Sequence, residues 1–215
     1  MRSRILPRVP WAAPHFWSTK PLPLLVSCTA LFLFGVGDGL VLQAGLGNSP
    51  WTIFAEGVSL HSPLSVGAAS LITSLVLLLL WIPLRVRIGL NTLLNAVLIA
   101  LAIDVTRAWL PVPHSSAGQW LYCLAGIGLG GMAAAFYLCA NMGAGPRDGI
   151  MVALSQRWGW PIAKTRTVME LFACTSGWLL GGNLGMGTLA FAVLIGPALA
   201  ATMRGFNRRY PAEIN

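Results

Sequence analysis

The chain of 215 residues is 56% hydrophobic and only 9% charged, with a mean hydropathy of +0.72. Soluble domains carry about 25% charged residues, so this balance excludes an ordinary soluble protein and predicts an integral membrane protein. The formal net charge of +8 does not indicate nucleic-acid binding, because the basic residues stand in short clusters between apolar runs and form no basic stripe.

The N-terminal residues 1–22 are rich in proline and contain no acidic residue. Their basic residues are Arg2, Arg4, Arg8 and Lys20. A cleaved signal peptide is the alternative interpretation, but the apolar run that follows is long enough to span, and no small-x-small cleavage site is clear. We therefore predict a basic cytoplasmic tail over residues 1–22, ahead of a single membrane domain over residues 23–205.

Six apolar runs follow, most of them close to the roughly 20 residues that a helix needs to cross a bilayer. They are Leu24–Leu46, Leu64–Leu84, Leu90–Leu110, Gln119–Met142, Thr165–Leu180 and Met186–Met203, of which the fifth is short. The runs predict an all-α fold, a polytopic membrane protein with six transmembrane helices. A second short tail is expected over residues 206–215.

The basic residues predict the orientation, because cytoplasmic loops carry an excess of Lys and Arg. With the N-terminus inside, thirteen of the fourteen basic residues fall on the cytoplasmic side and only Arg107 falls outside. Both termini are therefore expected in the cytoplasm.

The sequence repeats itself at an offset of 96 residues. Gly89–Ile99 (GLNTLLNAVLI) aligns without a gap on Gly185–Ile195 (GMGTLAFAVLI), with seven of eleven pairs identical. Composition alone would give roughly one. Repeat one covers about residues 23–110 and repeat two about 119–205. Because each holds three spans, an odd number, the second must cross the membrane in the opposite sense, which predicts two inverted three-helix repeats.

Each repeat also contains one Gly-x-x-Pro break, which predicts the start of a half-helix of about ten residues. Ser49 is expected to cap the first half-helix and Pro50 to take its first position. Gly145 and Pro146 take these places in the second, followed by Asp148, an acid suited to the positive end of the helix dipole. Two arrangements stay open. Re-entrant half-helices would point their N-termini at a shared anion-attracting centre, whereas interfacial helices would lie flat at the surface, with Glu56 exposed to water.

Charges within the apolar runs are candidates for substrate or ion binding, since a carboxylate at membrane depth is costly. Asp38 stands between two glycines with no basic neighbour in sequence, which makes it the better proton-coupling candidate. Glu170 follows Arg166 by four residues, so a structural i,i+4 pair is the alternative to a functional role. Arg147 and Asp148 fit a cytoplasmic gate and a capped helix start equally well.

The candidate substrate- or ion-binding residues are thus Asp38, Ser49, Pro50, Glu56, Gly145, Pro146, Arg147, Asp148, Arg166 and Glu170. No catalytic residue, metal site or cofactor is predicted. GIGLGG lacks the strand-turn-helix context of a dinucleotide fingerprint, and no metalloprotease spacing or phosphate-binding loop stands in the sequence, so an enzyme is not expected.

Four segments together resemble a known family. LGNSPWTIFAEGVS, IPLRVRIGLNTLLNAVLIALAIDV, GAGPRDGIMVALSQR and GNLGMGTLAFAVLIGP are similar to the YczE/YyaS/YitT group of bacterial inner-membrane proteins. The resemblance covers nearly all of residues 25–205, and GPRDG is its most specific element. It implies a small multi-pass protein of the bacterial inner membrane and names no substrate.

The leading hypothesis is a secondary transporter or exporter of a small polar or anionic molecule, working as a monomer or a homodimer in the lipid bilayer. The half-helix N-termini would bind the unknown substrate, and Asp38 or Glu170 would carry a coupling proton. The alternative is a non-transporting scaffold or regulatory partner that binds another membrane protein through its Gly-rich helix faces. A channel is the third hypothesis.

Overall fold

The protein is all-helical over the part of the chain that the computed structural model describes, which is residue 7 and residues 9–210. Arg2, Arg4 and Arg8 of the predicted N-terminal tail lie outside these residues, as do residues 211–215 of the C-terminal tail. The eight helices are α1 (Pro21–Ala44), α2 (Pro50–Leu60), α3 (Val66–Leu84), α4 (Leu90–Trp109), α5 (Ser116–Cys139), α6 (Pro146–Trp158), α7 (Ile162–Leu179) and α8 (Met186–Arg209).

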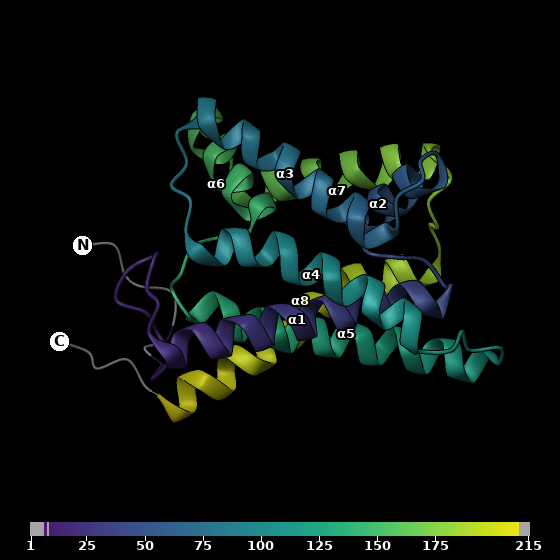
Figure 1. The fold of residues 1–215 in the computed structure, drawn as a ribbon, viewed down its shortest axis with the longest axis horizontal. Coiled ribbons are helices and arrows are strands. Elements are labelled where there is room, and N and C mark those ends of the chain that lie inside the picture. The colour runs from purple at the N-terminus through teal and green to yellow at the C-terminus, as the bar shows by residue number, and fades with distance from the viewer. Residues whose placement is uncertain (1–6, 8, 211–215) are drawn as a thin grey trace.

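The helices form two layers (Figure 1). The first contains α1, α4, α5 and α8, with α1 packed on α4 and α5, and α8 packed on α5. The second contains α2, α3, α6 and α7, with α2 packed on α7 and α3 on α6. Helix α3 also packs on α4 and joins the layers. Each layer therefore combines helices from both halves of the chain.

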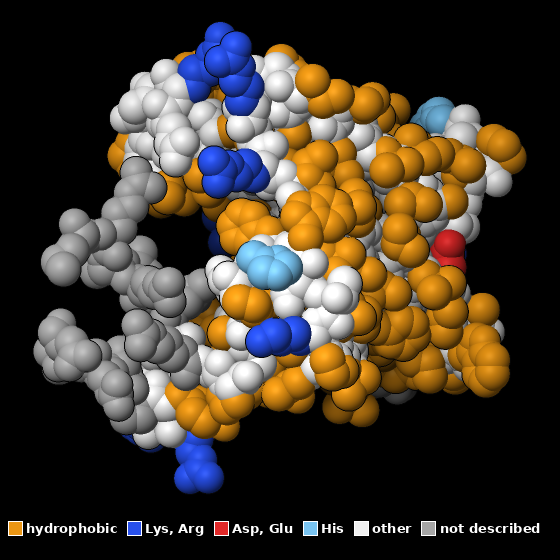
Figure 2. Space-filling view, turned by 60° about the vertical axis from the view of Figure 1, so that its left-hand side comes forward, with side chains coloured by type: hydrophobic (Ala, Val, Ile, Leu, Met, Phe, Trp, Pro, Cys, Tyr) orange, Lys and Arg blue, Asp and Glu red, His pale blue; other side chains and the backbone are white. Residues whose placement is uncertain are grey.

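Five helices are long and apolar enough to cross a membrane: α1, α3, α4, α5 and α8. The fifth expected span, α7, is not among them, because Lys164, Arg166 and Glu170 stand in its first half. Hydrophobic side chains cover most of the face in Figure 2, as lipid contact requires. The Lys and Arg side chains visible there lie in the left-hand part of the view, away from the broad hydrophobic area on the right.

Both predicted half-helices begin at their proline. Helix α2 has 11 residues from Pro50 and α6 has 13 from Pro146, with Gly145 at the cap position of α6. Ser49 stands at the N-cap position of α2 as expected, but its side chain makes no capping hydrogen bond. Its hydroxyl shares a 2.8 Å hydrogen bond with the Thr52 hydroxyl instead of accepting from a backbone N–H, because Thr52 is buried beside it.

The segment before α1 packs against the end of α5 instead of extending freely. Trp11 stacks on Phe136 with ring centroids 5.4 Å apart, and its indole N–H donates to the Phe136 carbonyl. The Ala13 N–H donates to the Ala140 carbonyl at 2.8 Å, and the Asn141 amide donates to the Ala13 carbonyl at 2.9 Å. These bonds tie the start of the chain to its middle.

Helices α1 and α5 approach closely at glycine. A Cβ atom on Gly37 would lie 2.7 Å from the Gly126 carbonyl oxygen, so neither position has room for a side chain. This contact fixes the part of α1 that carries Asp38. Close glycine contacts of this kind are typical of helix pairs in membranes.

We predict that Gly126→Leu will lower the thermal unfolding temperature, with a cost of about 1–3 kcal/mol, because the added side chain must separate α5 from α1. Gly128→Leu is the matched control, since a Cβ there meets nothing within 4 Å. Both variants are compared with the parent by unfolding in the same detergent. Equal stability of the two variants would contradict the close packing.

Candidate functional site

The two half-helices meet at their N-termini inside the molecule. Trp51 and Arg147 occupy the second positions of α2 and α6, and the Arg147 guanidinium carbon lies 5.2 Å from the centre of the Trp51 ring. This cation–π contact is made between residues that are 96 apart, the offset of the sequence repeat.

A cavity of about 450 Å³ lies at this meeting point, with charged side chains set in a largely apolar wall, and we call it the central cavity. Eight of the ten residues predicted from the sequence line it: Asp38, Ser49, Pro50, Gly145, Arg147, Asp148, Arg166 and Glu170. They come from α1, from the starts of α2 and α6, and from α7. Three of the six acidic residues of the chain thus share one cavity with two arginines.

Asp38 is 4% exposed, and its Oδ2 atom is buried without a hydrogen-bond partner in the described part of the chain. The glycines on either side hold it there, because Gly37 lies against Gly126 of α5 and Gly39 lies against Thr106 of α4. A buried carboxylate with an unfilled acceptor is costly, so it is suited to bind a proton or a ligand group.

Arg166 and Glu170 form the expected i,i+4 ion pair, with Nε donating to Oε1 at 2.8 Å. Their side chains are 54% and 38% exposed, so water screens the pair and it stabilises the fold little. Because both residues also line the central cavity, the pair can contact a ligand bound there.

Sequence reasoning missed two polar residues of the cavity, Tyr137 and Asn95. The Tyr137 hydroxyl donates to Asp148 Oδ2 at 3.1 Å, which links α5 to the start of α6. The only signal in the sequence was the polar group that each of these side chains carries within an apolar run. Tyr137 shares the cavity wall with Phe34 and packs edge-on against it, with ring centroids 6.4 Å apart.

Two predicted residues lie outside the cavity lining. The Pro146 carbonyl accepts a 2.9 Å hydrogen bond from the Trp81 indole, which fixes α6 against α3. Glu56 Oε2 accepts from the Asn48 amide at 2.7 Å and from the Asn183 N–H at 2.8 Å. We call Asn48, Glu56 and Asn183 the polar lock. It joins α2 to the loop between α7 and α8.

A second, larger hollow of about 800 Å³ borders the central cavity, and we call it the arginine pocket. It lies between the end of α3, the following loop and α6, and Arg85, Arg87 and Arg157 line it. Ala144 and Val152 line both hollows and therefore lie between them. Within residue 7 and residues 9–210, no group of three or more His, Cys, Asp or Glu side chains is placed to hold a metal ion.

Apolar helices long enough to span a bilayer, arranged around a cavity that holds charged side chains, define an integral membrane protein. Residues 22–204 match a family described as a family of unknown function (DUF6198), and the chain belongs to this family. It is 40% identical over 193 residues to an uncharacterized protein of Haemophilus influenzae, covering 90% of this chain and 88% of the relative.

The chain is also 33% identical over 168 residues to the uncharacterized membrane protein YczE of Bacillus subtilis, covering 77% of this chain and 78% of that protein. This match confirms the resemblance to YczE-like membrane proteins that the sequence segments indicated. No solved structure matches the chain.

The partners of Glu56 and Glu170 differ in burial, since Asn48 is buried and Arg166 is 54% exposed, and we predict that removal of the two carboxylates differs in cost. Glu56→Ala leaves the amide of Asn48, a residue with 0% exposure, without its acceptor, which costs about 1–3 kcal/mol. Glu170→Ala breaks a half-exposed pair and costs less than about 1 kcal/mol. Thermal unfolding in one detergent measures both. A larger loss for Glu170→Ala would contradict the polar lock.

Proposed function

We propose that the protein is a secondary transporter or exporter of a small polar or anionic molecule in the bacterial inner membrane, with a proton as the coupling ion. The observation that carries this proposal is the central cavity, which concentrates five charged side chains in a chain that is only 9% charged. Charges inside a membrane protein are expensive and mark substrate and ion pathways. A membrane protein with a purely structural interior would not need charged side chains there, because apolar residues pack at lower cost.

The proposed architecture is six transmembrane helices in two inverted repeats, with α2 and α6 as re-entrant half-helices. Reciprocal hydrogen bonds support it. The Asn91 N–H donates to the Met142 carbonyl at 3.0 Å, and the Gly187 N–H donates to the Leu46 carbonyl at 2.7 Å. Each atom of the first bond lies 96 residues from its counterpart in the second. Transporters built from such repeats bind substrate at the repeat junction.

The lining of the central cavity supports the same architecture. It contains residues from both repeats at matching positions: Asp38 and Ala134, Ser49 and Gly145, Trp51 and Arg147, Asn95 and Phe191, Ile99 and Ile195. A cavity on the pseudo-two-fold axis must be lined in this paired way. Helix α7 is proposed as the sixth span, with Arg166 and Glu170 turned to the cavity and its apolar residues to lipid.

The contrast between the two ends of the molecule supports alternating access. At one end the polar lock joins Asn48, Glu56 and Asn183. The residues at the matching positions of the other repeat are Ala144, Val152 and Arg87, which make no such lock and line the arginine pocket. One end is therefore closed by hydrogen bonds and the matching end is hollow, as one state of a two-state transporter requires.

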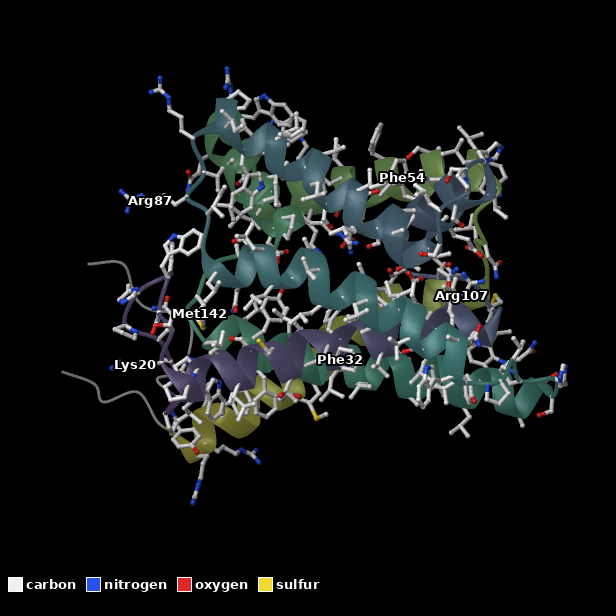
Figure 3. All side chains as sticks on the ribbon, in the orientation of Figure 1. Lys20, Phe32, Phe54, Arg87, Arg107 and Met142 are labelled. Carbon is white, nitrogen blue, oxygen red and sulfur yellow. The ribbon has the colours of Figure 1, made fainter. Side chains whose placement is uncertain are left out.

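The hollow end is proposed to face the cytoplasm. Lys20 and Arg87 lie at this end, whereas Arg107 lies at the opposite end (Figure 3). The positive-inside rule then directs both termini and the arginine pocket inward. In this orientation the polar lock closes the outer side.

Within the cavity we propose separate roles for the charged groups. The N-termini of α2 and α6, with Arg147, attract the anionic part of the substrate, since free N–H groups and the helix dipole favour negative charge. Asp38 carries the proton, because it is buried and its Oδ2 atom has no hydrogen-bond partner within the described residues. Asp148 is held by Tyr137 and orients the start of α6.

The alternative of a scaffold that binds a partner through Gly-rich faces finds less support. Gly37 and Gly126 lie against each other, and Gly131 lies against Ala198 of α8. These glycine faces are therefore occupied within the chain. An enzymatic function is not proposed, because the cavity groups form no nucleophile–base arrangement of the kind that catalysis uses.

We predict that reporter fusions after Arg87 and after Arg209 will both indicate the cytoplasm, because eleven of the twelve basic residues that do not line the central cavity then lie inside. A fusion after His114, in the loop between α4 and α5, should indicate the outside. A dual alkaline phosphatase and fluorescent-protein reporter measures each site. An outside signal after Arg87 or Arg209 would overturn the orientation and with it the inverted repeat.

We predict that the protein in proteoliposomes will take up at least one member of a panel of small anions and zwitterions in response to an imposed pH gradient. Asp38→Asn should abolish the dependence on the gradient while the protein stays folded, since the amide binds no proton. Glu170→Gln is the control that keeps this dependence. Counterflow and uptake of labelled compounds measure both. Unchanged gradient dependence in Asp38→Asn would remove Asp38 from the mechanism.

A further inference from the structure

The arginine pocket concentrates positive charge without any compensating acid. Arg85 and Arg87 belong to the loop after α3, and Arg157 stands near the end of α6. No Asp or Glu is among the residues that line the pocket, and none of these arginines forms an ion pair within the described residues. All three side chains are exposed and free to turn toward a ligand.

The positive-inside rule alone does not account for this arrangement. That rule concerns the number of basic residues on one side of the membrane and sets no requirement on where they converge. Here two segments that are distant in sequence bring their arginines to the same hollow of about 800 Å³. The last turns of α8, which carry Arg204, Arg208 and Arg209, lie at the same end of the molecule (Figure 1), but these arginines do not line the pocket.

The backbone conformation of Arg85 is a second observation in favour of a binding role for its side chain. Arg85 ends α3 in the left-handed conformation, with φ 52° and ψ 38°, and its N–H donates to the carbonyl of Ile82 at 3.1 Å. Glycine is the residue usually found at this position, because any side chain there is disfavoured. An arginine in this place brings a cation to the rim at a conformational cost.

The floor of the pocket is apolar and closely packed. Trp81 is 1% exposed, and its indole fills the space that a side chain at position 149 would need. Val86 and Val152 add aliphatic surface. A ligand that fits has a compact anionic group at the arginines and tolerates apolar surface beneath it. Guanidinium groups bind oxyanions through paired N–H donors, which makes phosphate and carboxylate the matching groups.

We propose that the arginine pocket is a binding site for an oxyanion, a phosphate or carboxylate group held by Arg85, Arg87 and Arg157. Ala144 and Val152 are the residues between this site and the central cavity. A soluble anion bound here stands at the mouth of the proposed transport pathway, whereas the phosphate of an anionic lipid would bind from the membrane. Binding at equilibrium does not depend on transport, so its test is separate from that of the proposed function.

The test uses the full chain in neutral detergent, with inorganic phosphate and succinate as soluble probes at constant ionic strength set by sodium chloride. Thermal unfolding and isothermal calorimetry measure binding. A second arm places the protein in nanodiscs of phosphatidylcholine with or without phosphatidylglycerol, and native mass spectrometry counts the lipids retained. The pocket variant is Arg85→Gln with Arg87→Gln and Arg157→Gln. The control variant, with equal loss of charge, is Arg204→Gln with Arg208→Gln and Arg209→Gln.

We expect saturable binding that weakens at least about tenfold in the pocket variant and stays within about twofold in the control. Binding of phosphate or succinate assigns the site to a soluble anion. Selective retention of phosphatidylglycerol alone assigns it to a lipid headgroup. Equal weakening in both variants, or no saturable binding of any probe, overturns the proposal. If the triple variant is not monodisperse, Arg157→Gln alone is compared with Arg208→Gln.

Discussion

Two stretches of non-helical backbone stand between helices of an apolar protein, and their polar groups must be satisfied from within. The first precedes α2 and the second precedes α6. In the first, the Leu46 carbonyl accepts from the Gly187 N–H, and the Asn48 N–H donates to the Asn183 carbonyl. In the second, the Met142 carbonyl accepts from the Asn91 N–H. Each break is thus bonded by the start of a long helix in the other half of the chain.

This constraint explains the most similar pair of segments in the sequence. The G-x-x-T start of α4 (Gly89 and Thr92) touches the second break, and the G-x-x-T start of α8 (Gly185 and Thr188) touches the first. The Thr92 hydroxyl donates to the Ala144 carbonyl at 2.7 Å, and its oxygen accepts from the Gly89 N–H at 3.1 Å. Glycine permits the close approach and threonine supplies both bonds. Each repeated G-x-x-T segment therefore packs on the repeated break of the other half of the chain.

Chemical differences are placed on this shared frame. Trp51 in α2 corresponds to Arg147 in α6, and the pair makes one cation–π contact where two tryptophans or two arginines would not. The large and the small side chain also change places at one helix contact that occurs in both repeats. Gly149 accommodates Trp81, whereas at the matching contact Ile53 lies against Gly177. Duplicated backbones can keep their hydrogen bonds while the side chains at the centre diverge, and an asymmetric charge distribution in the cavity is one result.

The sequence was sufficient for features that depend on local chemistry. Proline at a first helical position fixed the starts of α2 and α6, and a spacing of four residues on one helix brought Arg166 to Glu170. Features that depend on partners far along the chain were not predictable. Tyr137 reads as one more apolar residue until α6 brings Asp148 to its hydroxyl.

The hydrogen-bond partners of Glu56 were also not predictable from the sequence. Its position five residues after Trp51 does not indicate whether the side chain faces a cavity or a loop. In the structure it faces the loop before α8, where the Asn183 N–H donates a hydrogen bond to it. The composition of residues 1–22 likewise gives no sign that Trp11 stacks on Phe136 of α5, because that contact depends on where the helix ends. Hydropathy and local spacing specify which segments are helices. The partners of their polar side chains are specified by tertiary packing.

The charges of the central cavity define how an anion and a proton would be linked in the proposed transporter. Arg147 lies over an aromatic ring and makes no ion pair within the described residues, while Asp38 keeps a buried oxygen without a hydrogen bond. An anion bound at Arg147 adds negative charge to a cavity that already holds three carboxyl groups. The repulsion between the anion and Asp38 is strong at short range in an apolar wall, and a proton on Asp38 removes that part of it. Anion binding and protonation of Asp38 therefore favour each other, and linkage is reciprocal. A protonated Asp38 and a bound anion would move through the cavity together, which makes proton–anion symport the direction of coupling that this arrangement favours.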